Sequence, residues 1–171
     1  MPLKLTRAPH LVKNKIIETV AMLDLYRIEE GNSIVADLRK CIGKILSVLE
    51  TVETFEHSRI IKIREKLMSI LEEHVATENV DKNRFEQELI FYLEKYDINE
   101  EKVRLRTHCD YFLETINTPS PNGKILNFIA QEIGREINTI GSKANDASIQ
   151  KLVVMMKDEL EKIKEQTLNV L

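Results

Sequence analysis

The sequence predicts an all-α fold, an elongated helical bundle with long antiparallel helices and a coiled-coil-like C-terminal helix. Its 171 residues include five glycines and four prolines, and no proline falls between Pro9 and Pro119. Because proline is the residue that interrupts a helix most strongly, nothing in that stretch forces the backbone out of helical geometry. Apolar residues also recur at helical spacing from Ile16 onward. Helices are therefore expected along most of the chain.

Composition limits the class of protein. With 43% hydrophobic and 31% charged residues, the chain can bury a core of its own, and we expect one all-helical domain over residues 1–171. The net charge of -3 excludes bulk attraction to nucleic acid, so any RNA-binding surface must be local. No apolar run approaches the roughly 20 residues of a membrane span, and no secretory signal precedes the first helix. We therefore expect a cytoplasmic protein without a membrane segment.

The first half of the chain predicts two helices after a flexible lead-in over residues 1–10. The first runs from about residue 11 to residue 52, with Gly31 inside it. A glycine in a helix interior costs roughly 1 kcal/mol relative to alanine, so either the helix ends there or another group packs closely against Gly31. The second helix is expected over residues 56–74, with a basic outer face that includes Arg59.

Shorter helices follow in the second half. A loop over residues 76–83 precedes a helix over 84–95, and Asp97 with Glu100 resembles a capping box that starts a helix reaching residue 116. Two prolines and a glycine in residues 118–123 end that helix. The next is expected over residues 124–140, closed near Gly141.

The last helix, with Asn145 or Asp146 as its N-cap, carries a heptad pattern. Its apolar positions alternate steps of four and three residues, and they are Ile149, Val153, Met156, Leu160, Ile163, Thr167 and Val170. Such a seam needs a partner helix. The pattern alone leaves open whether that partner belongs to the same chain or to another subunit.

Common enzyme signatures are absent from the sequence. It contains no phosphate-binding GxxxxGK[ST] or GxGxxG motif, no HExxH, no GxSxG and no cysteine and histidine cluster at zinc spacing. The chain has no tryptophan, and only 5% of its residues are aromatic. Stacking on bases is therefore at most a minor part of any RNA contact.

Carboxylates beside arginines mark three of the later helices. Such pairs are usually exposed ion pairs worth at most about 0.5 kcal/mol each. Alternatively, the carboxylates are hard oxygen ligands for Mg²⁺ or Mn²⁺, and the arginines contact phosphates. Both interpretations remain open for this set: Arg84, Glu88, Glu101, Arg104, His108, Glu132, Arg135, Glu136 and Lys143.

The amino-acid sequences of three segments resemble those of the bacterial YicC/YloC family. The most specific is NFIAQEIGREINTIGSKAND at residues 127–146, continued at 157–169. The other two, in the same order as in the family, are RFEQE through DINEEKVRLRTH at residues 84–108 and RIEEGNSIVAD at residues 27–37. Gly134 departs from the family pattern, where a polar residue usually precedes the Arg-Glu pair.

The resemblance implies an all-helical C-terminal domain of a metal-dependent endoribonuclease that acts on RNA as a ring-like homo-oligomer, a hexamer. In the family a separate N-terminal domain of comparable size precedes it. We find no counterpart of that domain here, so the chain is expected to be a shortened form whose catalytic competence is open.

Three chemical roles follow for the candidate residues. We expect Glu132, Glu136 and His108 to be catalytic, with His108 as a metal ligand or a general acid. We expect Glu88, Glu101, Glu132 and Glu136 to bind Mg²⁺ or Mn²⁺. Arg84, Arg104, Arg135 and Lys143 are the candidate RNA phosphate contacts. The alternative is a non-catalytic helical oligomerisation or RNA-binding module, in which these side chains are salt-bridge partners.

Overall fold

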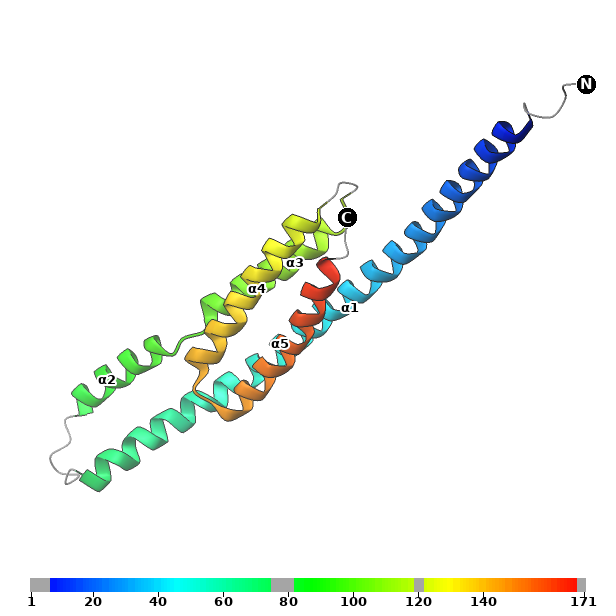
Figure 1. Ribbon diagram of the computed structural model, residues 1–171. Coiled ribbons are helices and arrows are strands. Elements are labelled where there is room, and N and C mark those ends of the chain that lie inside the picture. Colours follow the sequence, from blue (N-terminus) through cyan, green and yellow to red (C-terminus); the bar gives the residue numbers. More distant parts are fainter. Residues whose placement is uncertain (1–6, 75–81, 119–121, 169–171) are drawn as a thin grey trace, which may run out of the picture. The chain divides into compact units, whose positions relative to one another are not determined.

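The computed structural model describes residues 7–74, 82–118 and 122–168, which form five helices and no strand. In chain order these are α1 (Arg7–His74), α2 (Lys82–Lys95), α3 (Asn99–Thr115), α4 (Gly123–Ala144) and α5 (Ala147–Thr167) (Figure 1). The all-α prediction is confirmed. None of the helices in the described ranges has the length and apolar character that a bilayer crossing requires.

The chain divides into two compact units, residues 1–38 and residues 39–171. In the first, the described residues all belong to α1, and the side chains of residues 11–30 are exposed. Helix α1 begins at Arg7, and residues 1–6 of the predicted lead-in lie outside the described residues. Pro9 is accommodated because the first turn of a helix needs no backbone N–H donor. The prediction of one domain over the whole chain stays a prediction.

Gly31 neither ends a helix nor makes a close contact. Helix α1 continues through it, and nothing in the described chain lies within 4 Å of the position where a Cβ would stand. Both interpretations suggested by the sequence are therefore wrong for this chain. The glycine is accepted here because a long helix tolerates a single penalty of about 1 kcal/mol.

The predicted break between residues 52 and 56 is also wrong, because α1 is continuous there. The sequence has no glycine or proline from residue 44 to residue 74. The hydroxyl of Thr51 donates to the carbonyl O of Ser47 at 3.1 Å, and the hydroxyl of Thr54 donates to the carbonyl O of Thr51 at 2.7 Å. These polar side chains bond to the backbone of their own helix, so they do not interrupt it.

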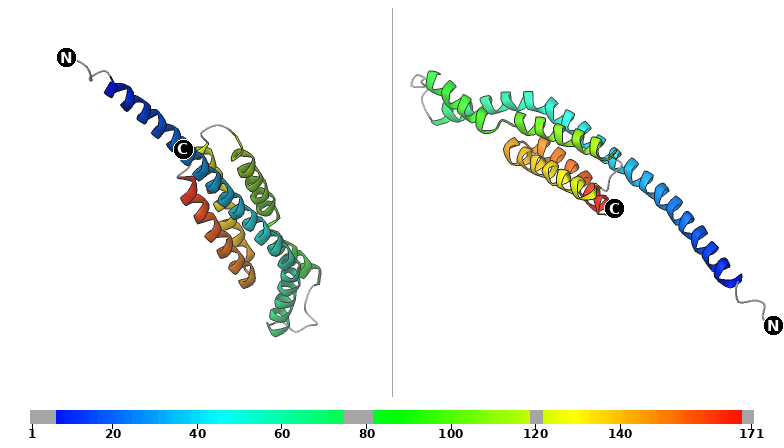
Figure 2. Two further views of the ribbon diagram at one scale, coloured as in Figure 1. Left: turned by 90° about the vertical axis from the view of Figure 1, so that its right-hand side faces the viewer. Right: turned by 90° about the horizontal axis from the view of Figure 1, so that it is seen from above.

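The core of residues 39–171 lies among four helices. Helix α3 packs on α4, and α4 packs on α5 (Figure 1). Both views of Figure 2 show the cyan part of α1 running alongside this group, and its ion pairs reach α3 and α5. Core side chains with at most 2% of their surface exposed come from all four helices and include Ile42, Ile45, Leu49, Leu105, Phe112, Ile133, Ile137, Ile140, Ile149, Met156 and Ile163.

Two glycines let α4 and α5 approach closely. A Cβ on Gly141 would stand 3.1 Å from Val153 Cγ1, and one on Gly134 would stand 3.0 Å from Leu160 Cδ2. The expectation that Gly141 closes the helix is wrong: α4 continues to Ala144 and ends at Asn145, whose φ of 44° is left-handed. Gly141 serves interhelical packing, and Asn145 supplies the turn.

Helix α5 begins as predicted. Asp146 Oδ1 accepts hydrogen bonds from the backbone N–H groups of Ser148 at 2.8 Å and Ile149 at 3.1 Å, which confirms Asp146 as the N-cap. All the heptad residues from Ile149 to Thr167 are buried, and Val170 lies outside the described residues. The seam is thus covered within the chain, with α4 as one partner, so these residues are not free to form a subunit interface. Coiled-coil geometry stays a prediction.

Candidate functional site on helices α3 and α4

The candidate site begins with the opposite charge of two neighbouring helix ends. Asp97 Oδ1 accepts from the backbone N–H of Asn99 at 2.8 Å, and the first turn of α3 carries Glu100 and Glu101. The last turn of α4 carries Lys143. Acids near a helix N-terminus and a base near a C-terminus each complement the helix dipole. The α3–α4 hairpin therefore brings carboxylates and an ammonium group together.

Glu101 and Lys143 form the first ion pair between these helices. Lys143 Nζ donates to Glu101 Oε1 at 2.8 Å, and only 4% of the Glu101 side chain is exposed. Glu101 Oε2 is also buried and has no hydrogen-bond partner among the described residues. A buried carboxylate oxygen without a donor carries a large desolvation penalty. This oxygen is therefore suited to accept another donor or a cation.

Arg104 links two carboxylates on different helices. Its Nη2 lies 3.0 Å from Glu100 Oε1, and its Nε lies 3.7 Å from Glu136 Oε2. Of the Glu136 side chain 8% is exposed, whereas the guanidinium is about half exposed. The anion is held inside the helix pair, and the cation remains accessible from solvent. This is the second acid–base pair along the α3–α4 seam.

The other candidates on these helices interact more weakly. His108 follows Arg104 by one turn, is half-buried, and makes no hydrogen bond or ion pair with the residues described. Arg135 Nη1 lies 3.9 Å from Glu132 Oε2 within α4, and the arginine is largely exposed. An exposed pair three residues apart contributes only a few tenths of a kcal/mol. Glu132 and Arg135 are thus available for other partners.

Two predicted site residues lie on another helix. Arg84 and Glu88 are exposed side chains of α2. One ion pair that joins α2 to another helix, Arg64 with Glu86, leads to α1. The grouping of Glu88 with the α3–α4 carboxylates therefore stays a prediction.

One buried cation was missed by the sequence analysis. Arg59 was expected on the outer face of its helix, but it is only 5% exposed. One of its nitrogens donates to the backbone carbonyl of Tyr96 at the end of α2, while Nε and Nη1 have no partner among the described residues. A signal was present: Arg59 lies seven residues after buried Val52, in register with the seam.

The number of available side-chain ligands determines how a divalent cation could bind at this site. Among the described residues, no group of three or more His, Cys, Asp or Glu side chains is placed to hold a metal ion. Mg²⁺, however, is usually bound by one or two carboxylates, with waters and substrate phosphates as the other ligands. Glu101, with its unpartnered oxygen, and Glu136 fit that partial role.

Comparison with known proteins identifies the family. The family model described as "Endoribonuclease YicC-like, C-terminal" matches residues 52–171, which include every candidate site residue. A relative named probable endoribonuclease YicC from Clostridioides difficile (strain 630) is 34% identical over 161 residues, which are 94% of this chain and 55% of the relative. One with the same name from Haemophilus influenzae is 35% identical over 107 residues, 63% of this chain and 37% of the relative.

The chain thus spans about half the length, or less, of the curated relatives that it matches. The family match includes α2 to α5 and the end of α1. The α3–α4 ion pairs therefore lie inside the part of the chain that the family defines. On this evidence, the chain belongs to the YicC-like endoribonuclease family, through its C-terminal domain.

Proposed function

We propose that this chain acts in endoribonucleolytic cleavage of RNA, with the α3–α4 seam as its reaction site. The observation that carries the proposal is the repeated pairing of a buried carboxylate with an accessible cation, Glu101 with Lys143 and Glu136 with Arg104. Its relatives are named probable endoribonucleases. In this arrangement anions for metal or proton chemistry lie inside, and cations for phosphates lie outside.

The cations would bind the RNA backbone. Arg104 and Lys143 are partly exposed, and Arg135 is largely exposed, so phosphate oxygens can reach all three. A guanidinium also presents donors in a fork that matches two phosphate oxygens. When phosphates attract these cations, Glu136 and Glu101 lose part of their neutralisation. Arg84 on α2 would extend the contact along the strand.

The released carboxylates would then serve the cleavage reaction. Glu101 and Glu136 are the residues that would hold Mg²⁺ or Mn²⁺, with Glu132 one turn away from Glu136 and Glu88 as a further ligand. When bound, such an ion supplies a more acidic water and neutralises charge on the phosphodiester. His108, one turn beyond Arg104, would give a proton to the leaving oxygen, and Glu132 would remove one from water.

The assembly and location belong to the same proposal. We expect the chain to act on RNA as a homo-oligomer, a hexamer, in the cytoplasm. The resemblance to the family is the basis of this expectation.

A second candidate function is a non-catalytic helical module. The observation that favours it is that Glu101 and Glu136 already have cationic partners, so they can be explained as ion pairs that align α3 with α4. In that case their loss weakens the fold but removes no reaction.

One set of variants separates the two functions. The 171-residue chain is incubated with a structured RNA in Mg²⁺, in Mn²⁺ and with a chelator. Glu136→Gln and Glu101→Gln are compared with Glu159→Gln, a half-buried carboxylate on α5 whose partners are Lys44 and Lys162. We expect the first two variants to lose about a hundredfold or more in cleavage rate, and the control to keep it.

Thermal unfolding of each variant shows whether its fold is retained. Cleavage that survives chelation, or no cleavage with any divalent ion, contradicts the proposal. RNA binding without cleavage, together with equal behaviour of all three variants, would favour the non-catalytic module.

A further inference from the structure

The first part of α1 exposes far more apolar surface than a free helix tolerates. Between residues 11 and 28, ten large apolar side chains are each 51–72% exposed, and they are Leu11, Val12, Ile16, Ile17, Val20, Met22, Leu23, Leu25, Tyr26 and Ile28. Large contiguous apolar patches on soluble proteins mark interaction sites. A helix that is apolar on several sides is normally covered. Exposed apolar surface of this extent is typical of a binding segment.

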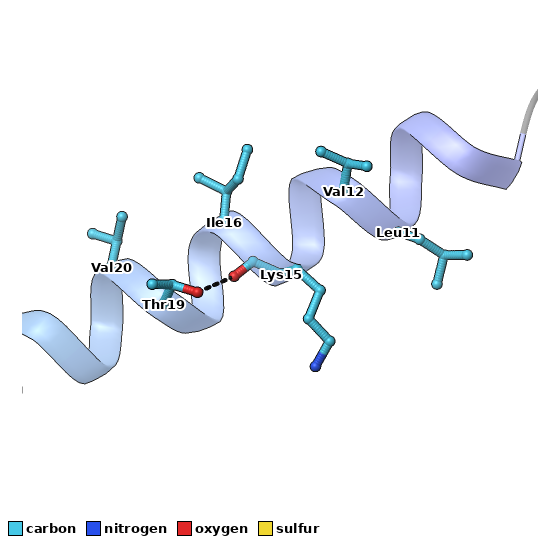
Figure 3. A pocket seen from close by; sticks show the side chains of 6 residues that line it. All are labelled: Leu11, Val12, Lys15, Ile16, Thr19 and Val20. Carbon is cyan, nitrogen blue, oxygen red and sulfur yellow. Dashed lines mark hydrogen bonds between the residues drawn. The ribbon is translucent and has the colours of Figure 1, made fainter.

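One face of the segment has the form of a helix-binding stripe. Figure 3 shows Val12, Ile16 and Val20 projecting in one row from the same side of α1. Together with Leu11, Lys15 and Thr19 they form a mainly apolar patch on this helix. Leu23 and Tyr26 continue the row at steps of three residues. A narrow row at these spacings fits the side chains of a second helix.

The segment is basic at one end and acidic at the other, and this distribution of charge indicates what kind of helix would bind it. Residues 4–15 include four basic and no acidic residues, whereas residues 18–30 include four acidic and one basic. The first turn of α1 also has no acidic residue, so basic charge lies at the positive end of the helix dipole. A partner that places acids beside this end and bases beside residues 18–30 complements both.

We propose that the partner is a second copy of this segment, packed antiparallel to the first. A two-fold axis then places the basic end of each copy beside the acidic end of the other, which satisfies both copies with one contact. Parallel packing would place like charges side by side. Lys15 pairs with Glu18 at 2.7 Å within one chain, but both side chains are largely exposed, so the pair can exchange partners at little cost.

The area available is sufficient for a specific interface. The interface would use six apolar side chains: Leu11, Val12, Ile16, Val20, Leu23 and Tyr26. Covering each of them removes roughly 100 Å² of apolar surface from water. The two copies together would bury about 1,200 Å², which is within the range of stable protein interfaces. The α5 heptad does not compete for this role, because its described residues are already buried. The proposal assigns a contact surface to the homo-oligomer of the proposed function and rests on that part of it, but it does not rest on ribonuclease activity.

Sedimentation equilibrium of the RNA-free 171-residue chain tests the surface. Ile16→Glu combined with Leu23→Glu is compared with Val154→Glu on α5, whose side chain is 55% exposed against 58% for Ile16. We expect association in the wild type, at least a hundredfold increase in the dissociation constant for the double variant, and no change for the control. Circular dichroism should show equal helix content in all three.

Two results would overturn the proposal. They are a wild-type chain that stays monomeric and a double variant that associates like the wild type. If the monomeric chain also binds anionic lipid vesicles or RNA through this segment, the stripe belongs to a different class of partner.

Charge exchange tests the antiparallel arrangement. Lys13→Glu with Lys15→Glu should weaken association about tenfold, and so should Glu29→Lys with Glu30→Lys; all four side chains are exposed. A chain with all four changes should recover, because opposite ends meet in the proposed dimer. If the variant with all four substitutions associates no better than either variant with two substitutions, the antiparallel arrangement is wrong.

Discussion

Leu160 Cδ2 lies 3.0 Å from the point that a Cβ on Gly134 would occupy, so the Leu160 side chain of α5 packs directly on the backbone of α4. Gly141 repeats the arrangement two turns later against Val153. The helix that carries Glu132, Glu136 and Lys143 is therefore held against α5 by side chains of α5 that pack on its glycine positions. Precise placement of the candidate site depends on this contact.

Gly134→Ala is expected to lower the free energy of unfolding by about 1 kcal/mol. Overpacking against buried Leu160 costs about 1–3 kcal/mol, and the better helix propensity of alanine returns up to about 1 kcal/mol. Gly43→Ala is the matched control, because nothing lies within 4 Å of its added Cβ. That variant should gain about 0.5–1 kcal/mol. Urea unfolding measures both, and equal effects of the two substitutions would contradict the packing argument.

Lys143→Met should destabilise the protein by about 1–3 kcal/mol. It leaves the buried Glu101 carboxylate without its hydrogen-bonded cation, and breaking such a pair is costly. The loss of stability is smaller than for a fully buried pair because Lys143 is partly exposed. Adding Glu101→Gln should restore much of the loss, since the unpaired charge is then removed. A double-mutant cycle by chemical unfolding checks this, and simple additivity of the two changes would argue against a direct pair.

The lowered pKa of Glu159 predicts that the contact between α1 and α5 becomes weaker in acid. A hydrogen bond from Lys162 at 2.7 Å, aided by Lys44 at 3.0 Å, lowers the pKa of Glu159 from 4.5 to about 2, against an opposing effect of burial. A lowered carboxyl pKa stabilises the fold above about pH 4.5, and this contribution is lost as pH falls toward 2.

Glu159→Gln should therefore cost about 1–2 kcal/mol at pH 7, an amount reduced because both lysines are solvated. It should also make the fall in stability between pH 4.5 and pH 2 shallower. Urea unfolding at a series of pH values measures this. An unchanged slope in the variant would show that Glu159 titrates normally in the folded protein.

The two cysteines are expected to differ in reactivity. Burial raises the pKa of the Cys109 thiol to about 12, so only about 10⁻⁴ of it is thiolate at pH 8. Cys41 is half-buried, and its pKa is raised by burial and by the Glu159 carboxylate. Iodoacetamide should modify Cys41 first and faster in Glu159→Gln, while Cys109 reacts only on unfolding. Modification of Cys109 at the rate of Cys41 would mean that the α3 core opens readily.

Local sequence signals predicted what depends on one or two turns of helix. The Asp146 N-cap and the burial of the seam from Ile149 to Thr167 were confirmed. The capping box at the start of α3 was wrong, because the N-cap is Ile98, whose side chain makes no capping hydrogen bond. Each confirmed feature rests on a side chain and backbone groups within four residues of it, or on a repeat along one helix. The candidate residues on α3 and α4 could be proposed for the same reason.

Features that depend on neighbouring helices could not be predicted. Gly31 and Gly141 give the same local signal, yet one lies in open space and the other touches Val153. Arg59 looks like a surface residue in the sequence, and it is buried because the end of α2 covers it. The pairing of Glu101 with Lys143 joins residues 42 positions apart, beyond the reach of any local pattern.

The sequence by itself determined that the chain is helical, where α5 begins, and which family it resembles, because propensity, capping and repeat spacing act within a few residues. Only the tertiary structure decided that α1 is continuous, that the α5 seam is covered within the chain, and that residues 11–28 are left uncovered. The physical reason is that burial belongs to surfaces in contact, and the chain must fold before it has such surfaces.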